Sequence, residues 1–196
     1  MPVRDVQFVP DHYYHLYNRG VNRQRIFVDD QDYCDFLRRI KENTAKFQVA
    51  VIAYCLEANH FHFCLRQDGA VKVGMAVQIA CNGYAQRFNL RHQRTGALFA
   101  GRFKAIPVTD DEYLHNLCWY IHGNPVKDNL ALQPELWPYS NYLEWIGQRN
   151  GTLVDREFIA THFGTAAHYR QLLIHYLTHS PKLPEKLRVY LAGLDG

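Results

Sequence analysis

Two histidines one residue apart are the first residues of this chain whose type and spacing suggest chemistry. The stretch NHFHF (59–63) places His60 and His62 in alternation with Phe61 and Phe63. Alternate side chains of a β-strand share a face, so both imidazoles and Cys64 would point one way and the phenylalanines the other. Two imidazoles at this spacing can converge on a metal ion. For an isolated pair, two hydrogen-bonded histidines remain the simpler explanation, so a third element is needed.

Zinc is the first kind of site to test. A structural zinc ion takes four protein ligands, and a catalytic zinc ion takes three plus water. Cys64 could supply the third ligand, but the chain has no CxxC, HxxxH or HExxH motif and no deaminase signature. Cys64 is then better explained as a small core residue. A zinc-dependent hydrolase using His60, His62 and Cys64 stays open as a weaker alternative.

A tyrosine and an asparagine further along the chain provide a second candidate pair. Tyr120 and Asn124 are four residues apart in DDEYLHNLCWYIHGNP (110–125) and would share one face of a helix. Asn124 directly precedes Pro125, where its amide oxygen can project outward. The chain holds 13 tyrosines, so Tyr120 taken alone is more simply a half-buried aromatic residue.

The elements that must position these residues follow a recognisable order. Periodicity and turn signals predict strands at 12–20, 48–57, 59–67 and 97–108 and helices at 29–47, 71–93 and 110–125. Their order along the chain is strand, helix, strand, strand, helix, strand, helix. The last helix should be stopped by Gly123 and Pro125. This is the ferredoxin-like split β-α-β order with an added helix. It predicts an α+β fold with an antiparallel sheet and helices on one face, so that the histidines lie on the open face.

The character of the chain changes after about residue 126. A loop-like stretch with proline and tryptophan precedes two short predicted helices at 155–163 and 168–177, and residues 180–196 should add one more short segment. The chain contains no internal repeat. We expect a main domain at 1–147 and a C-terminal helical extension at 148–196 that packs on or beside it.

Composition sets the broad class of the protein. The 196 residues are 47% hydrophobic and 21% charged, which is typical of a globular chain. The net charge of +3 permits a nucleic-acid partner without requiring one. Five cysteines without a CxxC pair indicate reduced thiols, and no signal segment or apolar run near ~20 residues is present. We therefore expect a soluble, cytoplasmic protein.

Several separate segments together resemble one protein family. CLEANHFHF, ALFAGRFKAIPV, YLHNLCWYIHGNPV and WPYSNYLEWIG occur in the order seen in REP-associated tyrosine transposases, and YHLYNRGVNRQRIF resembles their first strand and turn. These proteins belong to the single-tyrosine HUH transposases, named for a histidine, a bulky hydrophobic residue and a histidine. The resemblance covers roughly residues 12–147, which would form the HUH transposase domain.

The resemblance implies a specific chemistry. His60, His62 and Asn124 would bind Mg²⁺ or Mn²⁺, and Tyr120 would attack a phosphodiester to form a 5′-phosphotyrosine. The implied substrate is single-stranded DNA near a palindromic hairpin, as in REP elements, and the implied protein is a monomer or homodimer with no membrane partner. Phosphate contacts are expected from basic residues that could equally form a solvated surface, namely Arg19, Arg87, Arg91, Arg102 and Lys104.

One position departs from the family pattern. Glu57 and Ala58 stand where relatives commonly have a Met-Pro pair. The loss of proline should loosen the hairpin turn, and the added carboxylate would either tune the metal site or face solvent. This departure keeps a second function open, that of a nucleic-acid-binding or regulatory protein of the same fold that does not cut DNA.

Overall fold

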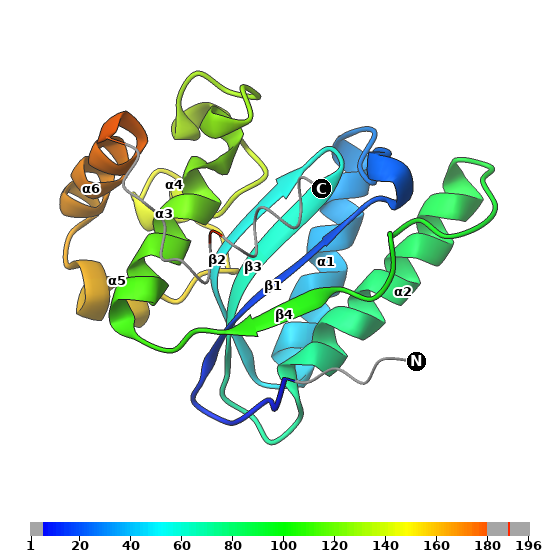
Figure 1. Cartoon of the computed structure of the whole chain (residues 1–196), viewed down its shortest axis with the longest axis horizontal. Coiled ribbons are helices and arrows are strands. Elements are labelled where there is room, and N and C mark those ends of the chain that lie inside the picture. Colours follow the sequence, from blue (N-terminus) through cyan, green and yellow to red (C-terminus); the bar gives the residue numbers. More distant parts are fainter. Residues whose placement is uncertain (1–5, 180–187, 189–196) are drawn as a thin grey trace.

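A single antiparallel sheet organises the chain in the computed structural model, which describes residues 6–179 and Arg188. Its strand order is β2-β3-β1-β4, with β1 at Tyr13–Arg19, β2 at Val49–Glu57, β3 at His60–Gln67 and β4 at Lys104–Pro107 (Figure 1). The first and last strands along the chain, β1 and β4, are therefore neighbours in the sheet, as the split β-α-β order requires. The predicted fold class is confirmed.

Two helices cover one face of this sheet. Helix α1 (Asp30–Lys46) begins at Asp29, whose carboxylate accepts a hydrogen bond from the Asp32 amide, and α2 (Val73–Arg91) lies beside it (Figure 1). The alternation of β3 sends Phe61 and Phe63 into this layer, where both are fully buried. This layer is the main hydrophobic core, and it confirms which way the two phenylalanines face.

The face expected to be open is instead covered by further helices. Helix α3 (Asp111–Lys127) packs on β2 and β3, and α5 (Arg156–Phe163) and α6 (Ala166–His179) lie outside it (Figure 1). Tyr17, Cys55 and Cys64 point to this side and are buried among α3, α5 and α6. An apolar face of a sheet must be covered, so helices on a single face would have been insufficient. Three short helices complete the described chain at Val21–Arg23, Pro134–Leu136 and Tyr142–Trp145.

Two predicted boundaries are wrong. Helix α3 does not stop at Gly123 and Pro125 but continues to Lys127, because the proline lies in the last turn, where few backbone bonds remain to be broken. Gly123 is instead a contact site, since a Cβ there would lie 3.0 Å from Leu177 of α6. The last strand is shorter than 97–108, because before Lys104 the chain makes only an isolated bridge, between Phe99 and Gly20, and does not form a continuous strand.

The C-terminal helices α5 and α6 share a core cluster with α3. This packing does not mark a domain boundary at residue 147. That boundary stays a prediction. The segment expected within 180–196 lies outside the described residues apart from Arg188. Within the part of the chain that the structure describes, no helix is both long and apolar enough to cross a membrane.

Asn141 ties the segment after α3 to the sheet. Its side chain is fully buried, donates to the Ile52 and Leu153 carbonyls, and accepts from the Tyr54 amide and from His122. Asn141→Ala should lower the free energy of unfolding by roughly 3 kcal/mol or more, because several buried groups lose their partner together. Urea unfolding measures the loss. Asn116→Ala, which removes only a bond to the Glu112 carbonyl, should cost less than about 1 kcal/mol.

Candidate active site

Helix α3 aligns three polar side chains toward the sheet. Tyr120, Asn124 and Asp128 are spaced by four residues, so they follow one face of the helix to its C-terminal cap. The helix is fixed at its other end by Asp110, whose carboxylate accepts from the Tyr113 amide. Tyr120 is 8% exposed and Asn124 is buried, whereas Asp128 is exposed. The row therefore runs from the interior to the surface.

The β2–β3 hairpin supplies the opposite side of the site. His60 and His62 alternate on β3, and the strand register places Glu57 of β2 directly across from His60. The two-residue turn between the strands is firmly held, because the Ala58 carbonyl accepts from the Ile26 and Phe27 amides. The expected loosening of the turn by the absence of a proline stays a prediction.

The four residues predicted to act together are brought together. The Tyr120 hydroxyl lies 3.5 Å from His62 Nε2, and the Asn124 side-chain amide lies 3.3 Å from His60 Nε2. A half-turn of that amide would present Oδ1 to the same imidazole nitrogen. His62 of β3 thus faces Tyr120 of α3, and His60 of β3 faces Asn124 of α3.

Asn59 sets the orientation of the His60 ring. Its Oδ1 lies 2.7 Å from His60 Nδ1, where a carbonyl oxygen can only accept a hydrogen bond. Nδ1 therefore carries a proton, and Nε2 faces Asn124 and Glu57. A partner that fixes the tautomer in this way is the usual arrangement for a histidine that binds a metal.

His15 plays the corresponding part for His62. The fully buried His15 Nε2 lies 2.9 Å from His62 Nδ1, and burial lowers the pKa of His15 to about 3. Burial also lowers the pKa of His62, helped by the neighbouring His60 and His15, so both rings are neutral near pH 7. His15 was not among the residues predicted for the site. Its place on β1, in alternation with Tyr17 and Arg19, was the available signal.

Two carboxylates approach His60 as well. Glu57 is only 2% exposed, and its Oε2 lies 3.4 Å from His60 Nε2, so it does not face solvent. Ligand atoms of Glu57, His60 and Asp128 all lie within 4.8 Å of one another. Burial, followed by the Asp128 carboxylate, raises the pKa of Glu57 to about 9. Asp128 was not among the predicted site residues. The signal was available, because Asp128 follows Asn124 by four residues, as Asn124 follows Tyr120.

Comparison with known proteins identifies the family. The family model described as IS200-like transposase matches residues 8–124, more than half of the chain and every predicted metal and nucleophile residue. The chain belongs to the IS200-like transposase family. The resemblance to tyrosine transposases is thereby confirmed at the level of the family. No match was found among curated proteins.

One solved structure shares the fold of this chain, and a second is more distant. A REP-associated tyrosine transposase bound to a REP hairpin matches with a TM-score of 0.62 at 14% identity, covering 79% of this chain and 94% of the other. A putative transposase from Deinococcus radiodurans R1 matches with a TM-score of 0.42 at 14% identity, covering 60% of this chain and 96% of the other.

Cys64 does not join the polar cluster of this transposase. It is fully buried beside Cys118, at the level of His15 in the strand register. The candidate metal cluster found in the described residues consists of Glu57, His60 and Asp128 and leaves Cys64 out. The structure therefore gives no support to a zinc site built on His60, His62 and Cys64.

The basic residues predicted to contact DNA fall into two groups. Arg19 lies directly across β1–β3 from His60, and Lys104 lies across β1–β4 from Tyr17, so both belong to the face that carries Tyr120. The Lys104 ammonium is exposed and lies 5.9 Å from the centre of the Tyr17 ring. Arg102 is also exposed but precedes the strand, because β4 begins only at Lys104.

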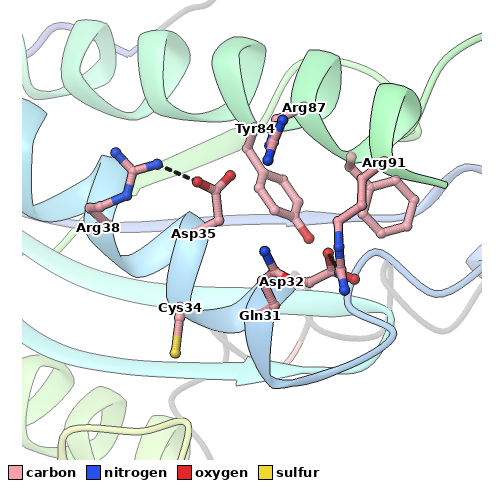
Figure 2. Close-up of a pocket in the computed structure, with 9 residues that line it drawn as sticks. Gln31, Asp32, Cys34, Asp35, Arg38, Tyr84, Arg87 and Arg91 are labelled. Atoms are coloured by element: carbon pink, nitrogen blue, oxygen red, sulfur yellow. Dashed lines mark hydrogen bonds and ion pairs between the residues drawn. The ribbon is translucent and has the colours of Figure 1, made fainter.

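Arg87 and Arg91 lie on the other side of the sheet. They line a pocket of 410 Å³ between α1 and α2 (Figure 2). Arg91 forms ion pairs with Asp29 at 2.6 Å and with Asp32 at 2.6 Å, so its charge is already balanced by carboxylates. The assignment of these two arginines to DNA stays a prediction, and it refers to a surface separate from that of Tyr120.

Whether the site suits a divalent metal can be judged from its donors. His60 Nε2 lies 3.4 Å from Glu57 Oε2, and Glu57 Oε1 is buried without a hydrogen-bond partner among the described residues. A buried carboxylate that lacks a full set of partners requires either a proton or a cation. Imidazole and oxygen donors together suit a divalent metal ion. The residues present therefore fit the metal that the family implies.

Proposed function

We propose that this family member cleaves and rejoins single-stranded DNA near palindromic hairpins, with Tyr120 as the nucleophile. The observation that carries the proposal is the position of the Tyr120 hydroxyl, 3.5 Å from His62 in the same site as His60 and Asn124. The Tyr120 hydroxyl faces His62, and His15 in turn orients the His62 ring. A nucleophile held by neighbours whose own positions are fixed is the usual pattern of covalent catalysis.

The chemical step follows from these contacts. A phenol with a pKa of ~10 is protonated near neutral pH, so Tyr120 must lose its proton as it attacks. Because His62 Nδ1 faces His15, Nε2 is the nitrogen left to bind the metal, and the Tyr120 proton passes to water at the open end of the site. The tyrosine oxygen then bonds to phosphorus, the bond from phosphorus to the 3′ oxygen breaks, and the leaving oxygen takes up a proton. The products are a 5′-phosphotyrosine and a free 3′-hydroxyl.

The metal ligands proposed in this site are His60, His62 and Asn124. A bound Mg²⁺ or Mn²⁺ would supply Lewis-acid polarisation of the scissile phosphate and offset the charge that develops on it. The residues of the chain orient the phosphate beside Tyr120 and limit access of water to the bond. The exposed end of the α3 row, at Asp128, is the side from which a DNA strand can approach.

Covalent capture explains why a tyrosine suits strand transfer. A phosphotyrosine ester retains the energy of the phosphodiester bond, so attack by a new 3′-hydroxyl can rejoin DNA without a nucleotide cofactor. A hydrolytic enzyme that used water would lose that energy. The proposal of a hairpin substrate is supported by the fold shared with the REP-associated transposase whose structure was solved on a REP hairpin.

A labelled single-stranded hairpin oligonucleotide tests the proposed function. Incubation with Mg²⁺ or Mn²⁺ should give a protein–DNA adduct that survives denaturing electrophoresis and does not form in the presence of a chelator. Tight binding without any adduct under all metal conditions would contradict the proposal. That result would favour the second candidate, a protein of this fold that binds nucleic acid without cutting it.

Lys104 provides a separate test of where the strand lies. Lys104→Met should weaken binding of a short single-stranded oligonucleotide by about threefold to tenfold and reduce its salt dependence by about 0.7 in log–log slope, because one phosphate contact is lost. Fluorescence anisotropy at several salt concentrations measures both quantities. Lys41→Met, which removes an exposed charge from α1 on the other side of the sheet, is the matched control. Equal weakening by both changes would mean that the strand does not follow the Tyr120 face.

A further inference from the structure

Glu57 is placed as a metal ligand would be placed. The β2–β3 register sets it directly opposite His60, so both side chains share the face that α3 covers. Its carboxylate is 2% exposed, with Oε2 at 3.4 Å from His60 Nε2. Oε1 is buried and has no hydrogen-bond partner. A side chain with only structural duties would be expected to satisfy both oxygens at such burial.

Among the described residues, no lysine or arginine forms an ion pair with Glu57. Its single ion-pair contact there is with His60, whose Nε2 lies 3.4 Å from Glu57 Oε2. Asp128 adds a second carboxylate, and ligand atoms of Glu57, His60 and Asp128 lie within 4.8 Å of one another. Two carboxylates that converge on an imidazole nitrogen repel each other unless a proton or a positive ion lies between them.

Asp128 also gives the cluster access to solvent. It caps α3, where its amide donates to the Asn124 carbonyl, and it is exposed while Glu57 is buried. The cluster therefore has a buried end and an open end. An ion can enter from solvent, and a phosphate oxygen can reach it from the same side.

We propose that Glu57 and Asp128, together with His60, bind the divalent cation of this site directly. Two carboxylates would neutralise the ion and provide the hard oxygen donors that Mg²⁺ and Mn²⁺ prefer, in addition to the histidines and Asn124. The departure from the usual Met-Pro pair then replaces an apolar residue with a ligand. This inference rests on the proposed metal-dependent function, but it can be tested without DNA.

Mn²⁺ binding to the full-length chain is the direct test. Titration followed by electron paramagnetic resonance measures the loss of the free Mn²⁺ signal as the ion binds. Glu57→Gln and Asp128→Asn should each weaken Mn²⁺ binding by about tenfold or more. Glu112→Gln, which neutralises an exposed carboxylate in the first turn of the same helix, should bind Mn²⁺ as the unmodified chain does. Unchanged affinity in Glu57→Gln would overturn the inference, and so would absence of Mn²⁺ binding by the unmodified chain.

Thermal unfolding separates a ligand from a purely structural residue. In the presence of a chelator, Glu57→Gln should melt at the same temperature as the unmodified chain or higher, because it loses an unsatisfied buried carboxylate. Added Mn²⁺ should raise the melting temperature of the unmodified chain and not of the variant. A variant that melts lower without metal, yet gains as much from Mn²⁺, would show that Glu57 only supports the fold.

The two proposals fail in different ways. If the unmodified chain forms the DNA adduct but Glu57→Gln binds Mn²⁺ normally, the ligand assignment is wrong and the proposed function stands. If Mn²⁺ binding depends on Glu57 but no adduct forms with any hairpin, the ligand assignment stands and the proposed function is wrong.

Discussion

Tyr120→Phe is expected to abolish the covalent protein–DNA adduct while leaving the fold and DNA binding intact. The substitution removes only the hydroxyl that lies 3.5 Å from His62. The ring keeps its edge-on packing against His62, with centroids 5.3 Å apart, and the Lys127 ammonium stays 5.8 Å from its centre. With no oxygen to attack phosphorus, adduct should fall below detection, whereas affinity for the uncleaved hairpin should change by less than about threefold.

Denaturing electrophoresis of a labelled hairpin with Mn²⁺ measures this effect. Tyr113→Phe is the matched control, because it removes a buried hydroxyl two turns earlier on the same helix and should leave adduct formation near the level of the unmodified chain. Adduct that persists in Tyr120→Phe would assign the nucleophile to another residue. Loss of adduct in both variants would point to damage of α3 rather than to chemistry.

His60→Ala should cause the second large loss, a fall in the cleavage rate of roughly 100-fold or more at any Mg²⁺ or Mn²⁺ concentration near the physiological range. His60 is the imidazole nearest to both Asn124 and Glu57, so its removal takes the central donor from the site. It is also partly exposed, unlike His62, so its replacement should disturb the fold less.

Single-turnover cleavage of the labelled hairpin measures that rate. His168→Ala, which changes an exposed histidine of α6, should cleave at the rate of the unmodified chain. Cleavage by His60→Ala at an undiminished rate would exclude His60 from the reaction. Recovery at millimolar Mn²⁺ would agree with a weakened metal site, because mass action can refill a site that has lost one ligand.

Part of this site could be read from the sequence because local geometry determines it. Strand alternation places His60 and His62 on one face whatever the rest of the fold does, and helical spacing does the same for Tyr120 and Asn124. That the two pairs meet required the order of the elements, and the resemblance to a family supplied the expectation. The fold class followed from the same order of strands and helices.

Other parts depend on long-range register, which local patterns do not encode. Glu57 faces His60 only because β2 and β3 pair in one register, and His15 reaches His62 only because β1 pairs with β3. The end of α3 was misjudged because Gly123 and Pro125 were taken as stop signals. In the structure Gly123 lets α6 pack closely against α3, and Pro125 lies within the last turn of α3 without ending the helix.

The arrangement of the site on two rigid pieces has a mechanical consequence. The hairpin carries Glu57 and both histidines, and α3 carries Tyr120, Asn124 and Asp128. Any shift of the helix along the sheet therefore changes every distance across the site together. The close approach of α6 at Gly123 opposes such a shift. We therefore expect the six side chains to come together or separate as one unit rather than residue by residue.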